Sequence, residues 1–285
     1  MNSCPDAKTI VFLLALLLPS FSILRAEPAL RGVSVSTGPE LFRYTYEEKG
    51  LMKETGTMYG VTAKVACRAD NMLGLFDLLQ VEGSLARASV DYDSNLSGSI
   101  DGIGDTIAEL RSLAGIDVSS RGSPVLTLFT GIGYRRLNDS GGGRRTSEGD
   151  YFYDRHSSSW YTPVGLVVGS GAKRGWVLGG WFEYDAFLGG TQYSELTDTN
   201  NREFSFSGNL ENEQHAGFGL RAGLVLTKRF PSFTLALEPF VRYWKIRSSE
   251  PGRVRMTENG SVHDELLIEP ENATTCCGLA VRLVM

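Results

Sequence analysis

Cysteine is scarce in this chain. Only four of its 285 residues are cysteines, and the first, Cys4, precedes an N-terminal apolar run. The other three are Cys67, Cys276 and Cys277. An odd number, with two members adjacent in sequence, does not describe the disulfide framework of a small secreted protein. We expect these three to act as small apolar side chains on strands, in keeping with the burial habits of free cysteine.

Histidine is scarce as well, and basic residues are not in excess. The three histidines, His156, His215 and His263, show no paired spacing, so the sequence predicts no metal site. No phosphate loop, dinucleotide fingerprint or nucleophile elbow is present, and we expect no cofactor. The formal net charge is −5, whereas a nucleic-acid-binding surface needs a basic face. We therefore expect no nucleic-acid partner.

Long hydrophobic runs are confined to the N-terminus. The stretch IVFLLALLL at residues 10–18 is shorter than the roughly 20 residues of a transmembrane helix. Together with the small residue Ala26, it predicts a cleaved signal peptide. Later apolar stretches, such as LTLFTGIGY and FGLRAGLVL, are interrupted by glycine or charge. The predicted organisation is a signal peptide at 1–26, a lead-in at 27–39 and one folded domain at 40–285.

A period of two is the main pattern that is present. In GWVLGGWFEYDAFLGG, residues 175–190, Trp176, Phe182 and Tyr184 alternate with Glu183 and Asp185, which is typical of a strand with two different faces. Similar patterns predict ten strands near residues 40–48, 58–68, 78–92, 106–115, 124–137, 152–170, 174–188, 213–228, 232–246 and 272–285. The strand at 106–115 has the weakest pattern and is compatible with a short helix.

The connections differ in length. SGAKRG and KRFPS are tight turns, whereas residues 138–151, 189–212 and 247–271 are long and polar. Short periplasmic turns and long external loops are typical of bacterial outer-membrane barrels. We therefore predict an all-β fold, a closed antiparallel transmembrane β-barrel of ten strands, with eight or twelve strands as alternatives. A soluble secreted β-sandwich is the competing fold.

In such a barrel the apolar face meets lipid and the charged face lines the lumen. Aromatic residues near strand ends, Trp160, Trp176, Tyr184 and Tyr243, would form girdles at the membrane surfaces. The same parity places fourteen charged side chains in the lumen: Arg43, Glu47, Lys64, Arg68, Glu82, Glu109, Arg111, Arg135, Glu183, Asp185, Arg221, Glu238, Arg242 and Arg282. Opposite charges can neutralise one another there. We expect a largely plugged lumen, because wide pores need 16–18 strands.

Five segments resemble the small outer-membrane β-barrel proteins of Gram-negative bacteria, porin-like barrels about the size of omptins. They are YEEKGLMKETGTMYGV, GIGYRRLND, EYDAFLGG, LEPFVRYWKI and EPENATTCCGLAVRLVM, and the resemblance covers residues 38–285. It implies a bacterial outer-membrane location, contact with outer-membrane lipid and lipopolysaccharide, and recognition by the barrel insertion machinery. Such barrels usually end with an aromatic residue; this chain ends with Met285, and we still expect insertion.

Two motifs suggest chemistry. Asp91 and Asp93 in DYDSN resemble an acidic pair at the rim of omptin proteases, but the loop that should hold an Asp-x-His partner has no histidine. His263 and Asp264 lie in the following loop instead. Catalysis requires these groups to lie within hydrogen-bond reach, so we interpret Asp91 and Asp93 as turn residues.

The second motif is RHSSSW, in which His156 and Ser158 share the lipid face of a strand. The pair is similar to the His-x-Ser pair of outer-membrane phospholipases and lipid A deacylases, with serine as nucleophile and histidine as base. An orienting Asn or acid cannot be identified from sequence. The leading hypothesis is a non-enzymatic outer-membrane barrel, either a narrow pore or a scaffold that presents loops for binding or adhesion to an unspecified extracellular ligand. The alternative is an outer-membrane enzyme, a lipid hydrolase or an omptin-like protease.

Overall fold

The computed structural model describes residues 32–72, 74–118, 125–170 and 174–285. The predicted signal peptide at 1–26 lies outside these residues. In this part of the chain, no helix is long and apolar enough to cross a membrane. One short 3-10 helix, η2 (Leu196–Thr199), is present.

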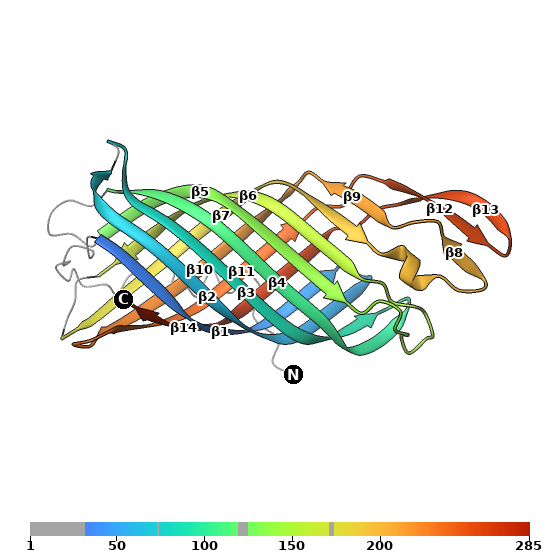
Figure 1. Ribbon diagram of the computed structural model, residues 1–285, viewed down its shortest axis with the longest axis horizontal. Helices are drawn as coiled ribbons and strands as arrows, with labels where there is room; N and C mark the ends of the chain where they lie inside the picture. Colours follow the sequence, from blue (N-terminus) through green and yellow to red (C-terminus); the bar gives the residue numbers. More distant parts are fainter. Residues whose placement is uncertain (1–31, 73, 119–124, 171–173) are drawn as a thin grey trace.

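The predicted fold class is confirmed, because the described chain forms a closed antiparallel barrel of ten strands (Figure 1). The strands are β1 (Gly32–Glu48), β2 (Met52–Met72), β3 (Phe76–Ser94), β4 (Gly98–Asp117), β5 (Val125–Ser140), β6 (Arg155–Gly169), β7 (Trp176–Ser194), β10 (Gly217–Arg229), β11 (Thr234–Ile246) and β14 (Asn272–Val284). Pairing of β1 with β14 and of β7 with β10 closes the sheet. β1 thus begins inside the predicted lead-in.

The two ends of the barrel differ. Four short connections lie at one end, here called the turn end, between β2 and β3, β4 and β5, β6 and β7, and β10 and β11. The opposite end, the loop end, carries all three long connections, at 141–154, 195–216 and 247–271, together with two short ones, between β1 and β2 and between β3 and β4. The C-terminus lies at the turn end (Figure 1). This confinement of the long connections to one end follows the pattern predicted from sequence.

The long connections at the loop end contain strands of their own. β9 (Leu210–Gln214) pairs with β7 and prolongs the barrel wall. β8 (Phe204–Phe206), β12 (Gly252–Glu258) and β13 (Ser261–Leu267) form a separate three-stranded sheet in the order β13-β12-β8, which projects beyond the barrel (Figure 1). Asn259 and Gly260 join β12 to β13 with φ angles of 48° and 80°, the left-handed conformation of a two-residue hairpin loop. We call these three strands the outer sheet.

The outer and inner faces of the barrel wall exchange their polarity between the turn end and the loop end. Toward the turn end the exposed face is apolar and the inner face is polar. The exposed residues there include Val33, Leu41, Val61, Val65, Val81, Leu85, Leu110, Leu128, Ile132, Val164, Phe182, Leu237 and Leu279, and we call them the apolar band. Toward the loop end the outward positions are polar and exposed, among them Arg43, Lys53, Thr57, Arg87, Asp91 and Arg136.

This reversal corrects part of the predicted lumen. Arg43 and Glu47 are exposed on the outside of β1, while Phe42, Tyr44 and Tyr46 point inward and are buried. The prediction assumed that charged positions always face the lumen. Beyond the apolar band the in–out alternation continues unchanged, but the polarity of the two faces is exchanged: the lumen there is packed with apolar side chains and the outer wall is polar.

Candidate functional site

The lumen inside the apolar band holds a buried layer of ion pairs. The Arg221 guanidinium donates from Nε to Asp185 Oδ2 at 2.6 Å and from Nη1 to Glu109 Oε2 at 2.8 Å. Arg111 donates to Glu183 Oε1 at 2.5 Å and to Glu82 Oε2 at 3.2 Å. Buried charges are tolerated only when they are paired in this way. These side chains come from β3, β4, β7 and β10, so the layer ties opposite walls together.

The other predicted lumen residues also point inward. Arg282 donates to Glu238 Oε1 at 2.8 Å and Arg242 to Glu40 Oε2 at 2.9 Å. The remaining contacts are Lys64 with Glu82, Arg68 with Asp117, and Arg135 over the Trp244 ring. The structure therefore gathers every residue of the predicted lumen network except Arg43 and Glu47. Glu40, which sequence analysis had not assigned to the lumen, belongs to it as well.

Open space in the lumen is confined mainly to the turn end. A cavity of about 360 Å³ lies there, lined by polar side chains such as Lys64, Arg68 and Thr234 and by apolar ones such as Leu78 and Val177. Further along, around Trp244 and Arg135, the free volume falls to about 20 Å³. A Cβ at Gly133 would overlap the ring of Tyr161, so this glycine allows the tyrosine to lie across the lumen.

An apolar layer follows toward the loop end. Its buried members are Phe42, Tyr44, Tyr46, Met52, Met58, Ala86, Ala88, Val90, Ile100, Ile103, Ile107, Leu137, Phe152, Phe240, Cys276 and Ala280. Such a cluster has the close packing of a soluble protein core. The ion-pair layer and this apolar layer together close the lumen of the described barrel.

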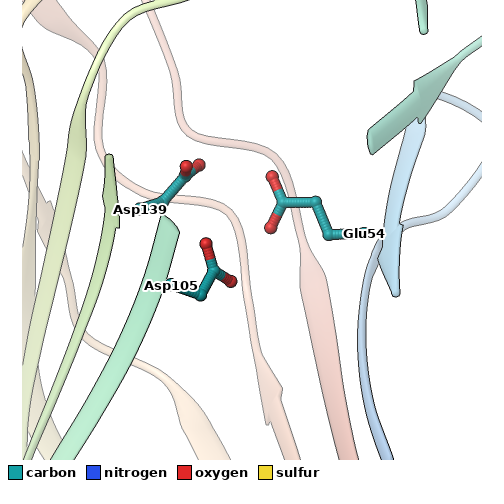
Figure 2. Close-up of side chains that lie close together, drawn as sticks. All are labelled: Glu54, Asp105 and Asp139. Atoms are coloured by element: carbon teal, nitrogen blue, oxygen red, sulfur yellow. The ribbon is translucent and has the colours of Figure 1, made fainter. Parts of the chain in front are cut away.

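Three buried carboxylates meet at the loop end, beyond the apolar band (Figure 2). Glu54 of β2, Asp105 of β4 and Asp139 of β5 each offer an oxygen, and these oxygens lie within 4.8 Å of one another. The three side chains are exposed by only 1%, 1% and 3%. Figure 2 shows the three carboxylates pointing toward a common centre. We call them the acidic cluster.

One arginine, Arg155, donates hydrogen bonds to the acidic cluster. Arg155 Nη2 donates to Glu54 Oε1 at 2.5 Å and to Asp139 Oδ2 at 2.8 Å, and Nη1 donates to Glu48 Oε1 at 3.0 Å. Neither carboxylate oxygen of Asp105 accepts a hydrogen bond of standard geometry within the described structure, and the Tyr44 hydroxyl interacts with this carboxyl only through a poorly aligned one. Burial raises the pKa of Asp105 to about 8, and the nearby Asp139 carboxylate raises it further while Arg155 opposes the shift. Burial also raises the pKa of Glu54 and Asp139.

The acidic cluster was not predicted from the sequence, because its members lie beyond the predicted strands. Glu54 precedes the predicted segment 58–68, Asp105 precedes 106–115 and Asp139 falls in a predicted loop. In the structure β4 and β5 place Asp105 directly opposite Asp139, and β5 and β6 place Asp139 opposite Arg155. Such cross-strand neighbours depend on register, which no local pattern in this sequence reveals.

The residues of the protease hypothesis are not brought together. Asp91 and Asp93 are exposed on the outside of β3, opposite Thr55 and Lys53 of β2. His263 lies in the outer sheet, where its Nε2 is 3.2 Å from Glu265 Oε1.

The lipid-hydrolase pair has neighbours that sequence analysis could not identify. His156 and Ser158 lie on the outside of β6, near the exposed Trp160. His156 Nδ1 is 3.0 Å from Asn138 Oδ1, and Nε2 is 3.2 Å from Glu195 Oε1. Ser158 Oγ is 3.0 Å from Thr191 Oγ1. An orienting amide and an acid are thus present, but the serine hydroxyl is bonded to threonine and the histidine nitrogen to glutamate.

Comparisons with known proteins bear on the fold. No protein-family model and no curated protein sequence matches this chain. The fold is similar to the crystal structure of the outer membrane protease OmpT from Escherichia coli, with a TM-score of 0.54 and 10% identity over 94% of this chain and 99% of that one. The translocator domain of the autotransporter NalP from Neisseria meningitidis matches with a TM-score of 0.41 and 12% identity over 96% and 93% of the two chains. At 10% identity, the likeness to OmpT shows the fold alone.

Proposed function

We propose that this protein is an integral protein of the bacterial outer membrane whose closed barrel acts as a scaffold for binding by the loop end. The apolar band supplies the lipid-facing surface that a transmembrane barrel requires. Trp160, Trp176 and Tyr184 are 52%, 46% and 43% exposed, as expected of aromatic anchors at the membrane surfaces. Outer-membrane lipid, lipopolysaccharide and the barrel insertion machinery are the partners that this location implies.

The filled lumen is the observation that carries the scaffold proposal. A narrow pore needs a continuous polar path, whereas here the ion-pair layer is followed by an apolar layer with the packing of a protein core. Permeation would require both layers to rearrange. Breaking buried ion pairs of this kind costs several kcal/mol, which favours the scaffold over the pore.

The outer sheet supports a binding role. β13 is an edge strand in the order β13-β12-β8, and its neighbourhood exposes Val262, Leu266 and Ile268 by 64%, 61% and 56%. Edge strands with exposed apolar side chains are suited to pairing with an extended segment of another protein. Binding on a rigid scaffold commonly resides in loops of this kind.

Planar-bilayer conductance of refolded residues 27–285 tests the proposal. A heat-shift gel should first show that the barrel has folded, and flotation with vesicles should show that it has inserted. We expect no unitary conductance steps from this folded, inserted protein. Reproducible steps would instead support the narrow pore, and a folded protein that fails to float with vesicles would contradict the membrane location.

The surroundings of His156 support a second candidate, hydrolysis of a lipid ester. Asn138 would orient the imidazole, and Ser158 would have to turn from Thr191 to His156 before attacking the ester carbonyl. In mixed micelles, Ser158→Ala should then abolish phospholipid hydrolysis, whereas Ser157→Ala on the opposite side of the same strand should not. Equal activity of the two variants, or an inactive wild-type protein, would eliminate this candidate.

A further inference from the structure

We propose that the acidic cluster of Glu54, Asp105 and Asp139 is a binding site for a hard divalent cation of the size of calcium. The site lies inside the barrel wall at the loop end and is independent of the scaffold and hydrolase proposals.

The geometry suits one ion held by three strands. An oxygen from each carboxylate lies within 4.8 Å of the other two, and this limit is about twice a typical calcium–oxygen distance of about 2.4 Å. Magnesium requires shorter bonds and nearly octahedral geometry, which would draw the three strands closer together. The donors are all oxygen atoms, and this composition favours hard cations over transition metals.

The carboxylates here outnumber the cations, so they need either protons, which their raised pKa values favour, or a bound cation that competes with those protons. Glu48, Glu54 and Asp139 share the single guanidinium of Arg155, and Asp105 has no cationic partner among the ion pairs of the described residues. Asp105 and Asp139 stand directly opposite each other on neighbouring strands, an arrangement in which like charges destabilise a sheet. A divalent ion between them would convert this repulsion into two attractive contacts.

A second observation points to a ligand at the same place. The hydroxyl of Tyr44 is fully buried and interacts with Asp105 through a hydrogen bond of poor geometry, since neither group has a partner in standard hydrogen-bond geometry. Both oxygens of Asp105 and Asp139 Oδ1 are likewise buried and without such a partner. Buried polar atoms are rarely left unsatisfied. A bound ion, coordinated by the carboxylates directly and by Tyr44 through water, would supply the partners that these four atoms lack.

Bound calcium would join the loop-end portions of β2, β4 and β5 beneath the long connections. The expected consequence is a barrel whose loop end is stabilised by calcium, since an ion that binds only the folded state raises stability, and the rise grows with the logarithm of the ion concentration above the Kd.

Calcium binding by refolded residues 27–285 in detergent micelles tests the proposal. The protein is stripped with a chelator and titrated with calcium alone, while bound metal is measured by calorimetry and thermal unfolding is followed in parallel. We expect saturable binding of one calcium per chain and a rise in the unfolding temperature. Asp105→Asn should lose both effects.

The matched control is Asp93→Asn, which removes the same charge from an exposed position of the adjacent strand β3 and should keep both effects. Asp105→Asn also removes a buried carboxyl that lacks a cationic partner, so without calcium this variant should fold at least as well as the wild type. Glu54→Gln provides a second variant with one carboxylate of the acidic cluster removed. A wild-type protein that binds no calcium, or Asp105→Asn that binds as the wild type does, would overturn the proposal.

Discussion

At the scale of single residues, Arg221 lies at the centre of the ion-pair layer in the lumen. It is 2% exposed and contacts Glu109 and Asp185. Arg221→Met would leave Asp185 without its donor and Glu109 without its cation. Because an uncompensated buried charge is costly, we expect the free energy of unfolding to fall by about 3–5 kcal/mol, measured by urea unfolding in lipid vesicles.

Arg136→Met is the matched control, since Arg136 is exposed on the outer wall. Its effect should stay within about 0.5 kcal/mol, as is usual for surface substitutions. A triple variant that also carries Glu109→Gln and Asp185→Asn should recover much of the lost stability. Equal effects of the two methionine variants would show that the ion-pair layer does not stabilise the barrel.

A second residue, Glu269, predicts a pH dependence at the loop end. Burial raises the pKa of Glu269 to about 7, Arg155 opposes the shift and the Glu48 carboxylate adds to it. The folded state therefore holds the proton more tightly than the unfolded chain. The resulting stability is fully present below the unfolded pKa of about 4.3 and is lost as the pH rises through about 7.

Glu269→Gln should remove this dependence. We expect unfolding curves at pH 5 and pH 8 to differ less in the variant than in the wild type, by on the order of 2 kcal/mol. Glu271→Gln, two residues away and partly exposed, should keep the wild-type slope. Parallel pH profiles for wild type and Glu269→Gln would contradict the assignment.

At the scale of strands, the wall within the apolar band was mostly predictable from the sequence, with the first half of β1 as the exception, whereas the inward face near the loop end was not. The alternation around Phe182 and Glu183 is typical of a wall between lipid and a polar lumen, and the predicted strand 174–188 corresponds to β7. Beyond the apolar band the wall separates water from an apolar core, so the same rule assigned Arg43 to the wrong side. Two strands were also predicted to begin too late, at residues 58 and 106, and this left Glu54 and Asp105 outside them.

We expect the barrel to fold without the outer sheet. Val254 of the outer sheet packs with Leu196 of η2 and Leu210 of β9 in a small cluster that is separate from the apolar layer of the lumen. Replacement of residues 253–266 by a short Gly-Ser turn should leave the barrel fold and its urea midpoint nearly unchanged, as judged by a heat-shift gel and by unfolding in vesicles. Loss of the folded band would show instead that the outer sheet is part of the cooperative unit.

At the scale of the whole molecule, one continuous set of ten strands serves two environments. The turn-end half has an apolar outer surface and a charged interior, and the loop-end half has a polar outer surface and an apolar interior. This arrangement would raise the loop end above the membrane while keeping it continuous with the anchored wall. It also explains why the interior is filled, since the loop-end half needs a core of its own.

The reversal predicts that the cost of an outward charge depends on its depth along one strand. Val65 and Thr57 both face outward on β2, the first within the apolar band and the second beyond it. Val65→Arg should lower the free energy of unfolding in lipid vesicles by about 2–4 kcal/mol, whereas Thr57→Arg should cost about 0–1 kcal/mol. Urea unfolding in vesicles measures both free-energy costs. In a protein that is not surrounded by lipid, the two substitutions would change the free energy of unfolding by similar small amounts. Equal costs would therefore refute the membrane depth assigned to the barrel, while the predicted difference would place the membrane border between these two residues.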